Sequence, residues 1–521
     1  MITRRTFLGS SALLGTELFA GPADSKTPSP ELEKLGAAAL REAKRLKAAY
    51  CDIRITRYRN QSVALRLTPE RGAGKTLAVP GVSDRDSFGF GVRVIANGAW
   101  GFAASPEVTP SEIARITGEA VTVARTNATL KSRPVVLAPV KAYRDRWRSP
   151  FQRSPFEVPV GEKLELLRAA AAEIKKEKRV FAAGAMLRFR SEDKYFASSE
   201  GSSIQQLVIH TYATLSATGV DFAKGITRTR NYSPAPLETG FEYVPIMNFQ
   251  ENARRIREEV LEHLAAPPVQ PGKKDLVLLP SHLWLTIHES IGHPTELDRA
   301  LGYEANFAGT SFLTPDKMGK ERIASEIVTF YGDRIYEQGL ATAGYDDDGV
   351  KTVRFPIIDK GVFVHYQTTR EMAPLAGEKQ SNGCCYAQSW SSIPFQRMPN
   401  IWLAPGKPGT TLEDLIAGVD DGVLIDGNGS FSIDQQRYNF QFGGDAFYQI
   451  KGGKKRGMLA RVAYQARTPD FWQACDAIAG PSLWQQYGAP NDGKGEPMQV
   501  NAVSHGCSPA RFRRINVIQT D

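Results

Sequence analysis

The segment with the clearest chemical potential is His288-Glu289-Ser290-Ile291-Gly292-His293. The 521 residues include only seven histidines, so chance rarely places two of them around a glutamate at such short range. Imidazole and carboxylate groups are common zinc ligands, and in the His-Glu-x-x-His helix of zinc peptidases the glutamate acts as general base. The segment therefore predicts a metal site with hydrolytic chemistry.

The two histidines stand one residue farther apart than in that familiar pattern. In an unbroken α-helix, a step of five residues places the second ring about 140° around the axis from the first. Gly292 favours a helix end, and Pro294 disfavours the α conformation at His293. We therefore expect His293 to leave the helix and turn back toward His288. A π-bulge would also bring the rings together, and the sequence does not distinguish the two.

A catalytic zinc usually takes three protein ligands and leaves one position for water, so another ligand must come from elsewhere. Cys507, within the Gly- and Pro-containing segment 504–509, offers a soft sulfur donor. His505, Glu296 and Asp298 are the alternatives. Residue type alone does not decide whether Cys507 is a ligand, because a lone buried cysteine more often only fills space in the core.

The motif requires a helix that carries His288 and Glu289 toward a common point. The apolar run 276–279 predicts a short buried strand just before it, and residues 249–264 predict an amphipathic helix farther upstream. The Pro- and Gly-containing stretch between them is the best linker in the chain. We therefore place an N-terminal α/β domain at 30–265, the linker at 266–274, and a C-terminal metallopeptidase domain at 275–521.

Both domains are expected to combine helices and strands. Residues 88–103 predict a hairpin around Asn97-Gly98, and the apolar positions from Leu164 to Ile174 predict another helix. After about residue 350 the chain is rich in Gly, aromatic residues and short alternating runs, which favours a curved antiparallel sheet or partial barrel. The predicted fold class is α+β, with a sandwich-like N-terminal domain and a β-rich C-terminal domain that carries the metal-site helix.

Several motifs together resemble those of the TldD/PmbA peptidases, and specifically the metal-bearing TldD-like branch. They run through most of the chain: the hairpin 88–103, the motif 288–293 with Glu296 and Asp298 after it, Gly309-Thr310-Ser311-Phe312, Asp346-Asp347-Asp348-Gly349, segments 394–400 and 403–406, and Gly506-Cys507. This combination is much more specific than the histidine motif alone.

The resemblance implies a metallopeptidase of the His-Glu-x-x-x-His type that cuts unfolded or extended peptides. It implies that His288, His293 and Cys507 hold one catalytic metal ion, usually zinc and otherwise another divalent transition metal, and that Glu289 is the general base. It also implies a dimer, formed with an identical chain or with a related subunit that lacks the motif. The alternative is a non-catalytic peptide-binding or assembly subunit of such a complex, against which the complete ligand set argues.

The same resemblance implies a mechanism. Zinc lowers the pKa of bound water toward about 7, so that Glu289 can take a proton from the water that attacks the peptide carbonyl. A thiolate donates more charge to the metal than a neutral imidazole does. With Cys507 as ligand we therefore expect a weaker Lewis acid than in a three-histidine site, and modest turnover.

The first residues predict where the protein acts. Thr3-Arg4-Arg5-Thr6-Phe7-Leu8 precedes a short, weakly apolar stretch that ends in small residues, which is typical of a twin-arginine signal. We expect cleavage between Ala20 and Asp24, so that residues 1–23 form the signal and the protein is periplasmic or exported in a bacterium. No later apolar run is long enough to span a bilayer, so no membrane association is expected after the signal is removed.

Composition excludes other classes of protein. The chain is 42% hydrophobic and 23% charged, as in ordinary globular proteins. Its net charge of +9 is not concentrated in a nucleic-acid-binding module, so no nucleic-acid partner is expected.

The acidic run 346–348 lacks the ligand spacing of a calcium loop and is expected to be a solvated turn. Four histidines without a ligand-spaced neighbour are expected to be structural: His210, His263, His282 and His365.

Overall fold

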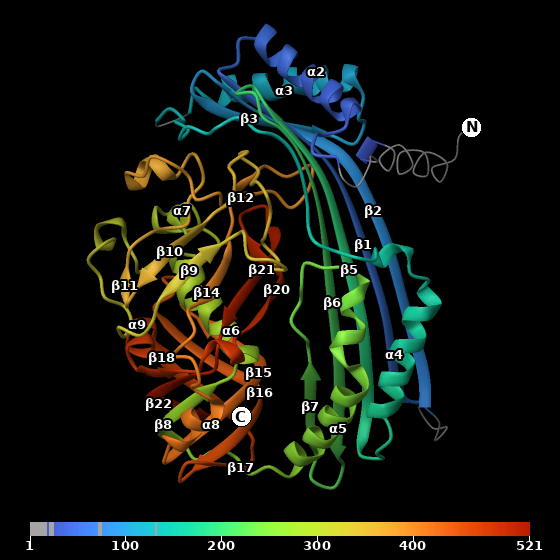
Figure 1. Ribbon diagram of the computed structural model, residues 1–521, viewed down its shortest axis with the longest axis vertical. Coiled ribbons are helices and arrows are strands. Elements are labelled where there is room, and N and C mark those ends of the chain that lie inside the picture. Colours follow the sequence, from blue (N-terminus) through green and yellow to red (C-terminus); the bar gives the residue numbers. More distant parts are fainter. Residues whose placement is uncertain (1–17, 20–24, 71–75, 131–132, 521) are drawn as a thin grey trace.

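The computed structural model describes residues 18–19, 25–70, 76–130 and 133–520. The predicted signal, residues 1–23, lies outside the described residues except for Leu18 and Phe19. Figure 1 shows two bodies side by side, a long curved sheet with helices and a more compact β-rich part. Within the described chain, no helix has both the length and the apolar character to cross a membrane.

The N-terminal part is built on one mostly antiparallel sheet with very long strands. Its seven strands run in the order β3-β2-β1-β5-β6-β4, and β7 also pairs with β6. Asn97 and Gly98, with φ of 52° and 76°, make the tight turn between β2 and β3, which confirms the predicted hairpin. The strands are β1 (Tyr50–Pro69), β2 (Thr76–Ala96), β3 (Ala99–Ser105), β4 (Arg144–Arg148), β5 (Val180–Ser198), β6 (Ser203–Asp221) and β7 (Ile226–Tyr232).

Helices cover one face of this sheet, and the C-terminal domain lies against the other. Successive residues of a strand point to opposite faces. In β1 the odd positions, such as Ile53 and Val63, pack under two pairs of helices, α2 with α3 and α4 with α5. The even position Arg54 instead reaches residues of the C-terminal domain. The helices are α2 (Pro30–Arg45), α3 (Pro110–Asn127), α4 (Val160–Ile174) and α5 (Phe249–Ala265).

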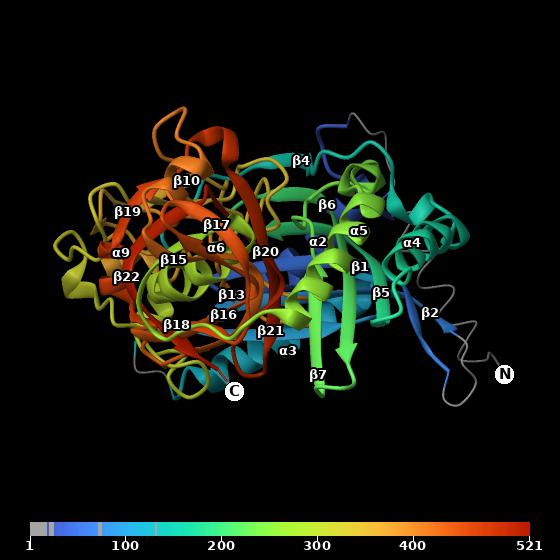
Figure 2. The same cartoon turned by 90° about the horizontal axis from the view of Figure 1, so that it is seen from below.

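The C-terminal domain contains a partial barrel, as the predicted fold class requires. The strands β15, β8, β22, β18 and β16 pair in this order, and β16 pairs back to β15. Figure 2 shows them arranged around α6 (Pro280–Ile287). The paired strands are β8 (Gly272–Leu278), β15 (Asp421–Ile433), β16 (Asn439–Lys451), β17 (Lys454–Leu459), β18 (Val462–Arg467), β19 (Cys475–Ile478) and β22 (Ala510–Gln519).

A second, six-stranded sheet closes over the other side of α6. Its order is β11-β10-β9-β14-β21-β20, so β20 is an edge strand. The long connection between α6 and β15 supplies its first four strands. They are β9 (Phe330–Asp333), β10 (Arg354–Asp359), β11 (Val362–Phe363) and β14 (Asn400–Leu403), followed by β20 (Gln485–Lys494) and β21 (Gln499–Cys507). Smaller elements are α7 (Leu297–Ala300), β12 (Cys385–Tyr386), β13 (Phe395–Gln396), α8 (Leu412–Ala417) and α9 (Thr468–Gln473).

The acidic run 346–348 joins the two domains, so the prediction of a solvated turn is wrong. All three aspartates are at most 5% exposed. Asp347 lies 2.7 Å from the Nζ of Lys194, and Asp348 lies 2.7 Å from Arg93. Both cations project from the N-terminal sheet. The cationic partners of the run come from strands more than 150 residues earlier in the chain. The sequence alone does not reveal these partners, so it predicts a solvated turn.

Candidate metal centre

A π-helix carries the predicted histidine motif. The α-helix α6 ends at Ile287, and His288–Gly292 form a π-helical turn followed by a 3-10 turn, His293–Thr295. The backbone N–H of His293 donates to the carbonyl of His288, five residues back. This wider turn returns the chain to the same side after five residues, and the two imidazole centroids lie 4.6 Å apart. The π-bulge alternative is therefore confirmed.

His293 does not leave the helix as expected. Its φ of −62° and ψ of −43° are helical, and Pro294 occupies the first turn of the 3-10 helix, where its missing N–H costs little. Gly292 is needed for a different reason from the one predicted. A Cβ atom on Gly292 would lie 2.5 Å from the Sδ of Met398, so glycine allows close packing under the π-turn.

Asp492, which the sequence did not single out, supplies the third group of the site. Its Oδ1 lies 3.4 Å from the Nε2 of His288 and 3.6 Å from the Nε2 of His293. One donor atom from each of the three buried side chains lies within 4.8 Å of the others, and no second such trio of His, Cys, Asp or Glu occurs among the residues that the structure describes. Two imidazoles and one carboxylate are a common donor set for divalent transition metals.

The Nδ1 atoms of His288 and His293 contact supporting side chains. His288 Nδ1 lies 2.7 Å from His505 Nε2, and His293 Nδ1 lies 2.8 Å from Glu296 Oε2. Such contacts fix the ring orientation in metal sites. Here they leave the Nε2 atoms of His288 and His293 facing Asp492. His505 and Glu296, alternatives for the third ligand, therefore lie behind the two motif histidines.

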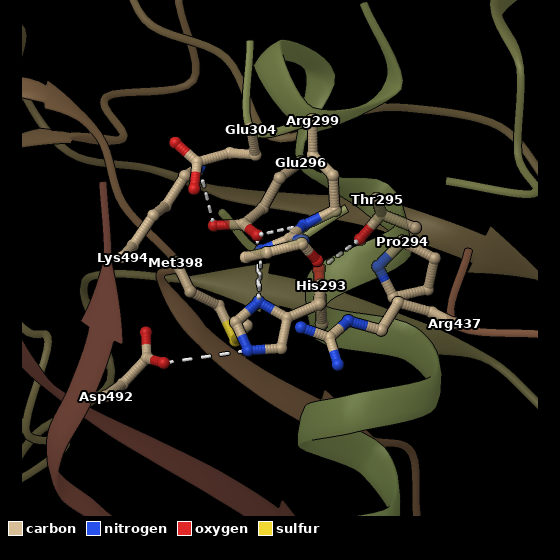
Figure 3. A network of polar contacts seen from close by, with 12 residues as sticks. His293, Pro294, Thr295, Glu296, Arg299, Glu304, Met398, Arg437, Asp492 and Lys494 are labelled. Carbon is tan, nitrogen blue, oxygen red and sulfur yellow. Dashed lines mark hydrogen bonds and ion pairs between the residues drawn. The ribbon is translucent and has the colours of Figure 1, made fainter. Parts of the chain in front are cut away.

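Glu296 belongs to a buried charge network next to His293 (Figure 3). It accepts hydrogen bonds from Arg299 Nε at 3.1 Å and Lys494 Nζ at 3.0 Å, and Lys494 also reaches Asp298 at 2.8 Å. Burial alone would raise the pKa of Glu296, but Lys494 and His293 hold it well below its usual range. Glu296 is thus an ionised acceptor for His293, and Asp298 serves as a second partner of Lys494.

The protonation states suit metal binding. Burial lowers the pKa of His293 to about 4, so its imidazole is neutral at pH 7. Burial opposes ionisation of Asp492, but the hydrogen bond and charge of His288 lower the pKa of Asp492 overall. The same contact outweighs burial at His288 and raises its pKa. A metal ion would replace that proton between His288 and Asp492, because metal ligands must be deprotonated.

Glu289 lies beside the two histidines and pairs with an arginine that sequence analysis missed. Its Oε2 atom is 3.2 Å from Nη1 of Arg437, and both side chains are largely buried. This ion pair is the only polar contact of the Glu289 side chain with the described residues. Arg437 lies in the turn between β15 and β16, and no spacing in the sequence connects it to the motif.

Cys507 is not part of the trio of donor atoms. It is fully buried at the end of β21 among apolar side chains, and burial raises the pKa of its thiol. His505, two residues earlier on the same strand, is the residue that reaches His288. Two residues along a strand correspond to ~7 Å. The structure brings His288, Glu289 and His293 together, and it places Asp492 rather than Cys507 beside the two imidazoles.

Comparison with known families gives this fold and site a context. Three family models match successive parts of the chain. PmbA/TldA metallopeptidase domain 1 matches residues 78–124, the central domain matches 153–258, and the C-terminal domain matches 271–518. The last match includes all residues of the candidate metal centre. The chain belongs to the PmbA/TldD family, which confirms the resemblance seen in its motifs.

Several of the proteins that are similar to this chain carry the name metalloprotease. One from Methanocaldococcus jannaschii is 26% identical, over 82% of this chain and 89% of the relative. A zinc metalloprotease TldD homolog of Saccharolobus solfataricus is 22% identical, over 84% of this chain and 91% of the relative.

The structure of TldE from Thermococcus kodakarensis has the same fold. It superposes with a TM-score of 0.71 at 17% identity, over 93% of this chain and 99% of that one.

Proposed function

We propose that this protein is a metal-dependent peptidase that hydrolyses unfolded or extended peptides, with Glu289 as general base. The observation that carries the proposal is the convergence of His288, His293 and Asp492 within 4.8 Å beside Glu289. Relatives named metalloproteases support it, and one of them is named a zinc enzyme.

His288, His293 and Asp492 would hold the ion, and the donor set fits zinc or another divalent transition metal. When bound, such an ion acidifies water and polarises the peptide carbonyl. A Cys507 ligand predicted a weakly Lewis-acidic metal. A carboxylate ligand does not, because oxygen is a harder donor than thiolate sulfur. With Asp492 as ligand, the reason given for modest turnover no longer applies.

The protein's own residues perform the proton transfers. The Glu289 carboxylate takes a proton from the attacking water and later gives it to the nitrogen of the leaving amine. His505 and Glu296 hold the two imidazoles in place through their Nδ1 atoms. Since these groups are buried, their orientation is fixed before the substrate binds, which reduces the cost of reorganisation during the reaction.

The direct test compares the wild type with Glu289→Gln. With zinc and a library of unstructured peptides, the wild type should release new amino termini, and Glu289→Gln should retain metal but lose cleavage. Glu413→Gln, in the surface helix α8, is the matched control and should cleave normally. Unchanged cleavage by Glu289→Gln would show that the mechanism is wrong. Metal binding without cleavage by the wild type would favour the non-catalytic subunit.

We also propose that the protein acts after twin-arginine export and as a dimer, with itself or with a motif-less relative. The support is the Arg4-Arg5 sequence and the family membership. Cell fractionation with amino-terminal sequencing tests the first part, and light scattering of the exported protein tests the second. A cytoplasmic product that retains residues 1–23 would contradict export.

A further inference from the structure

We propose that Arg437 is a further catalytic residue, whose guanidinium donates a hydrogen bond to the scissile carbonyl oxygen and stabilises the oxyanion that forms there. This proposal rests on the proposed peptidase function. It concerns a residue that lies almost 150 positions after the histidine motif and reaches the site only through the fold.

The turn that carries Arg437 is fixed in position. The Asp434 side chain accepts hydrogen bonds from the backbone N–H groups of Tyr438 and Asn439. On the outer side, the N–H of Thr310 donates to the carbonyl of Gln435 at 2.8 Å. These contacts hold the β15–β16 turn against the segment that begins at Gly309.

Gly309 is part of this arrangement. Its φ is +89°, and a Cβ atom there would lie 2.2 Å from the carbonyl oxygen of Gln435. The motif Gly309-Thr310-Ser311-Phe312, which the metal site does not use, therefore docks the turn of Arg437.

The backbone of Arg437 has a left-handed conformation that hydrogen bonds hold in place. Its φ is +63°, a conformation that favours glycine. The N–H of Arg437 donates to Asp434 O, and its carbonyl accepts from Thr468 Oγ1 at 2.7 Å. Strained residues of this kind persist where the surrounding structure holds them, and they cluster at functional sites.

The guanidinium has donors to spare. A guanidinium carries five N–H donors, yet with the described residues Arg437 makes one ion pair, with Glu289, and its buried Nε finds no acceptor among them. A buried donor without an acceptor is unfavourable. The side chain is 13% exposed, so part of it is open to solvent. A peptide carbonyl oxygen is an acceptor of the required kind.

The position of Arg437 relative to His293 and Asp492 fits a role in stabilising an oxyanion. In Figure 3 the guanidinium of Arg437 and the carboxylate of Asp492 lie on opposite sides of the His293 ring. When water adds to the carbonyl carbon, the π electrons move to the carbonyl oxygen and Glu289 takes the water proton. When the C–N bond breaks, the electrons return from oxygen and Glu289 gives its proton to nitrogen. Arg437 stays protonated throughout and donates most strongly when the oxygen is negative.

The test compares Arg437→Gln and Arg437→Lys with the wild type, and uses Arg461→Gln as matched control. Arg461 is also an arginine at positive φ in the C-terminal domain, but it bonds to the carbonyl of Thr520. Each variant is loaded with zinc, and kcat, KM, metal content and thermal stability are measured with the best peptide from the library. Affinity is also measured for a phosphinate version of that peptide, which mimics the tetrahedral state.

Arg437→Gln should lower kcat roughly 100-fold to 1000-fold, as loss of one oxyanion donor does elsewhere. It should weaken phosphinate binding by a similar factor, with KM and metal content little changed, and it should lower thermal stability because Glu289 loses its ion pair. Arg437→Lys should recover part of the loss, and Arg461→Gln should behave like the wild type.

Normal cleavage by Arg437→Gln, or equal weakening of substrate and phosphinate binding, would overturn the proposal while leaving the peptidase function intact. If the wild type cleaves no peptide, the proposed function fails and the proposal fails with it.

Discussion

At the scale of single residues, the choice between Asp492 and Cys507 as third ligand can be measured directly. Cobalt(II) bound to a thiolate has a strong sulfur-to-metal charge-transfer absorption in the near ultraviolet, which a site of imidazoles and a carboxylate lacks. We expect the cobalt-loaded protein to lack this absorption and Cys507→Ser to retain its metal. Asp492→Asn should lose metal affinity, because a neutral amide replaces the charged donor.

Asp492→Cys provides the positive control for this experiment. A sulfur at the end of this side chain should introduce the absorption that the wild type lacks. A thiolate band in the wild type that disappears in Cys507→Ser would instead restore Cys507 as the ligand.

Glu296 provides a second prediction at this scale. Glu296→Gln keeps the shape of the side chain but removes the charge that accepts from His293. Loss of such a supporting contact typically costs ~10-fold to 100-fold in metal affinity, and we expect an effect of this size in competition with a chelator. The control is Glu378→Gln, whose contact with the more exposed His365 lies outside the metal centre; it should leave the affinity unchanged.

The sequence predicted those site residues that are close together in the chain. His288, Glu289 and His293 form a local pattern whose chemistry can be recognised without the fold. Asp492 stands in the segment Asn491-Asp492-Gly493, which has no such pattern. It reaches the site because of the irregularity between Ala489 and Asp492 in the pairing of β20 with β21, and sequence periodicity does not reveal a bulge of this kind.

At the scale of secondary structure elements, the π-turn depends on close packing beneath it. In Gly292→Ala the new Cβ atom would press on the Sδ of Met398. We expect this change to destabilise the protein by ~1 to 3 kcal/mol and to weaken metal binding. Because the opposing atoms belong to a flexible side chain, Met398→Ala in the same molecule should recover part of the loss in denaturant titrations. Strictly additive effects would contradict direct contact between the two positions.

Elements with strong local signals were also the most predictable. The hairpin at Asn97-Gly98 follows from turn chemistry, and the helices at 164–174 and 249–264 follow from apolar periodicity. The end of the metal-site helix differs from the prediction because Gly292 allows tertiary packing against Met398 and Pro294 fits the first turn of a 3-10 helix. Only the contact with Met398 shows why glycine is required there.

At the scale of the whole molecule, buried ion pairs join the two domains. Arg93 lies between Asp52 of its own sheet and Asp348 of the C-terminal domain, with contacts of 2.7 Å to each. Arg93→Met would leave two buried carboxylates without this cation, which typically costs about 3 to 5 kcal/mol. Arg57→Met, which affects the more exposed pair with Asp86 in the same sheet, should cost less than ~1 kcal/mol. Urea denaturation compares the two, and equal losses would contradict the interpretation.

Acidification should lower the stability of the folded protein, because burial disfavours protonation of several of its histidines. Burial lowers the pKa of His282 and His263 to about 4 and that of His210 to about 3. Between these values and the unfolded value near 6.5, the unfolded chain binds more protons, so stability falls as the pH falls through this window. For His282 the loss between pH 7 and pH 4.5 is on the order of 2 to 3 kcal/mol.

His282→Gln tests this prediction. It will lower stability at pH 7 by disturbing the contacts of His282 with Gly427 and Tyr464, but it should lose less on acidification than the wild type does. His365→Gln is the control, because the hydrogen bond that His365 donates to Glu378 raises the pKa of that more exposed histidine. Identical acid sensitivity of His282→Gln and the wild type would refute the assignment.

The position of β22 in the barrel has a consequence for biosynthesis. This strand, near the end of the chain, inserts between β8 and β18, and Asp492 and His505 are themselves translated some two hundred residues after His288. A nascent chain on the ribosome therefore holds the histidine motif long before it can complete the sheet or close the donor set around an ion. We therefore expect a product truncated before Asp492 to lack the candidate donor set as well as the completed sheet.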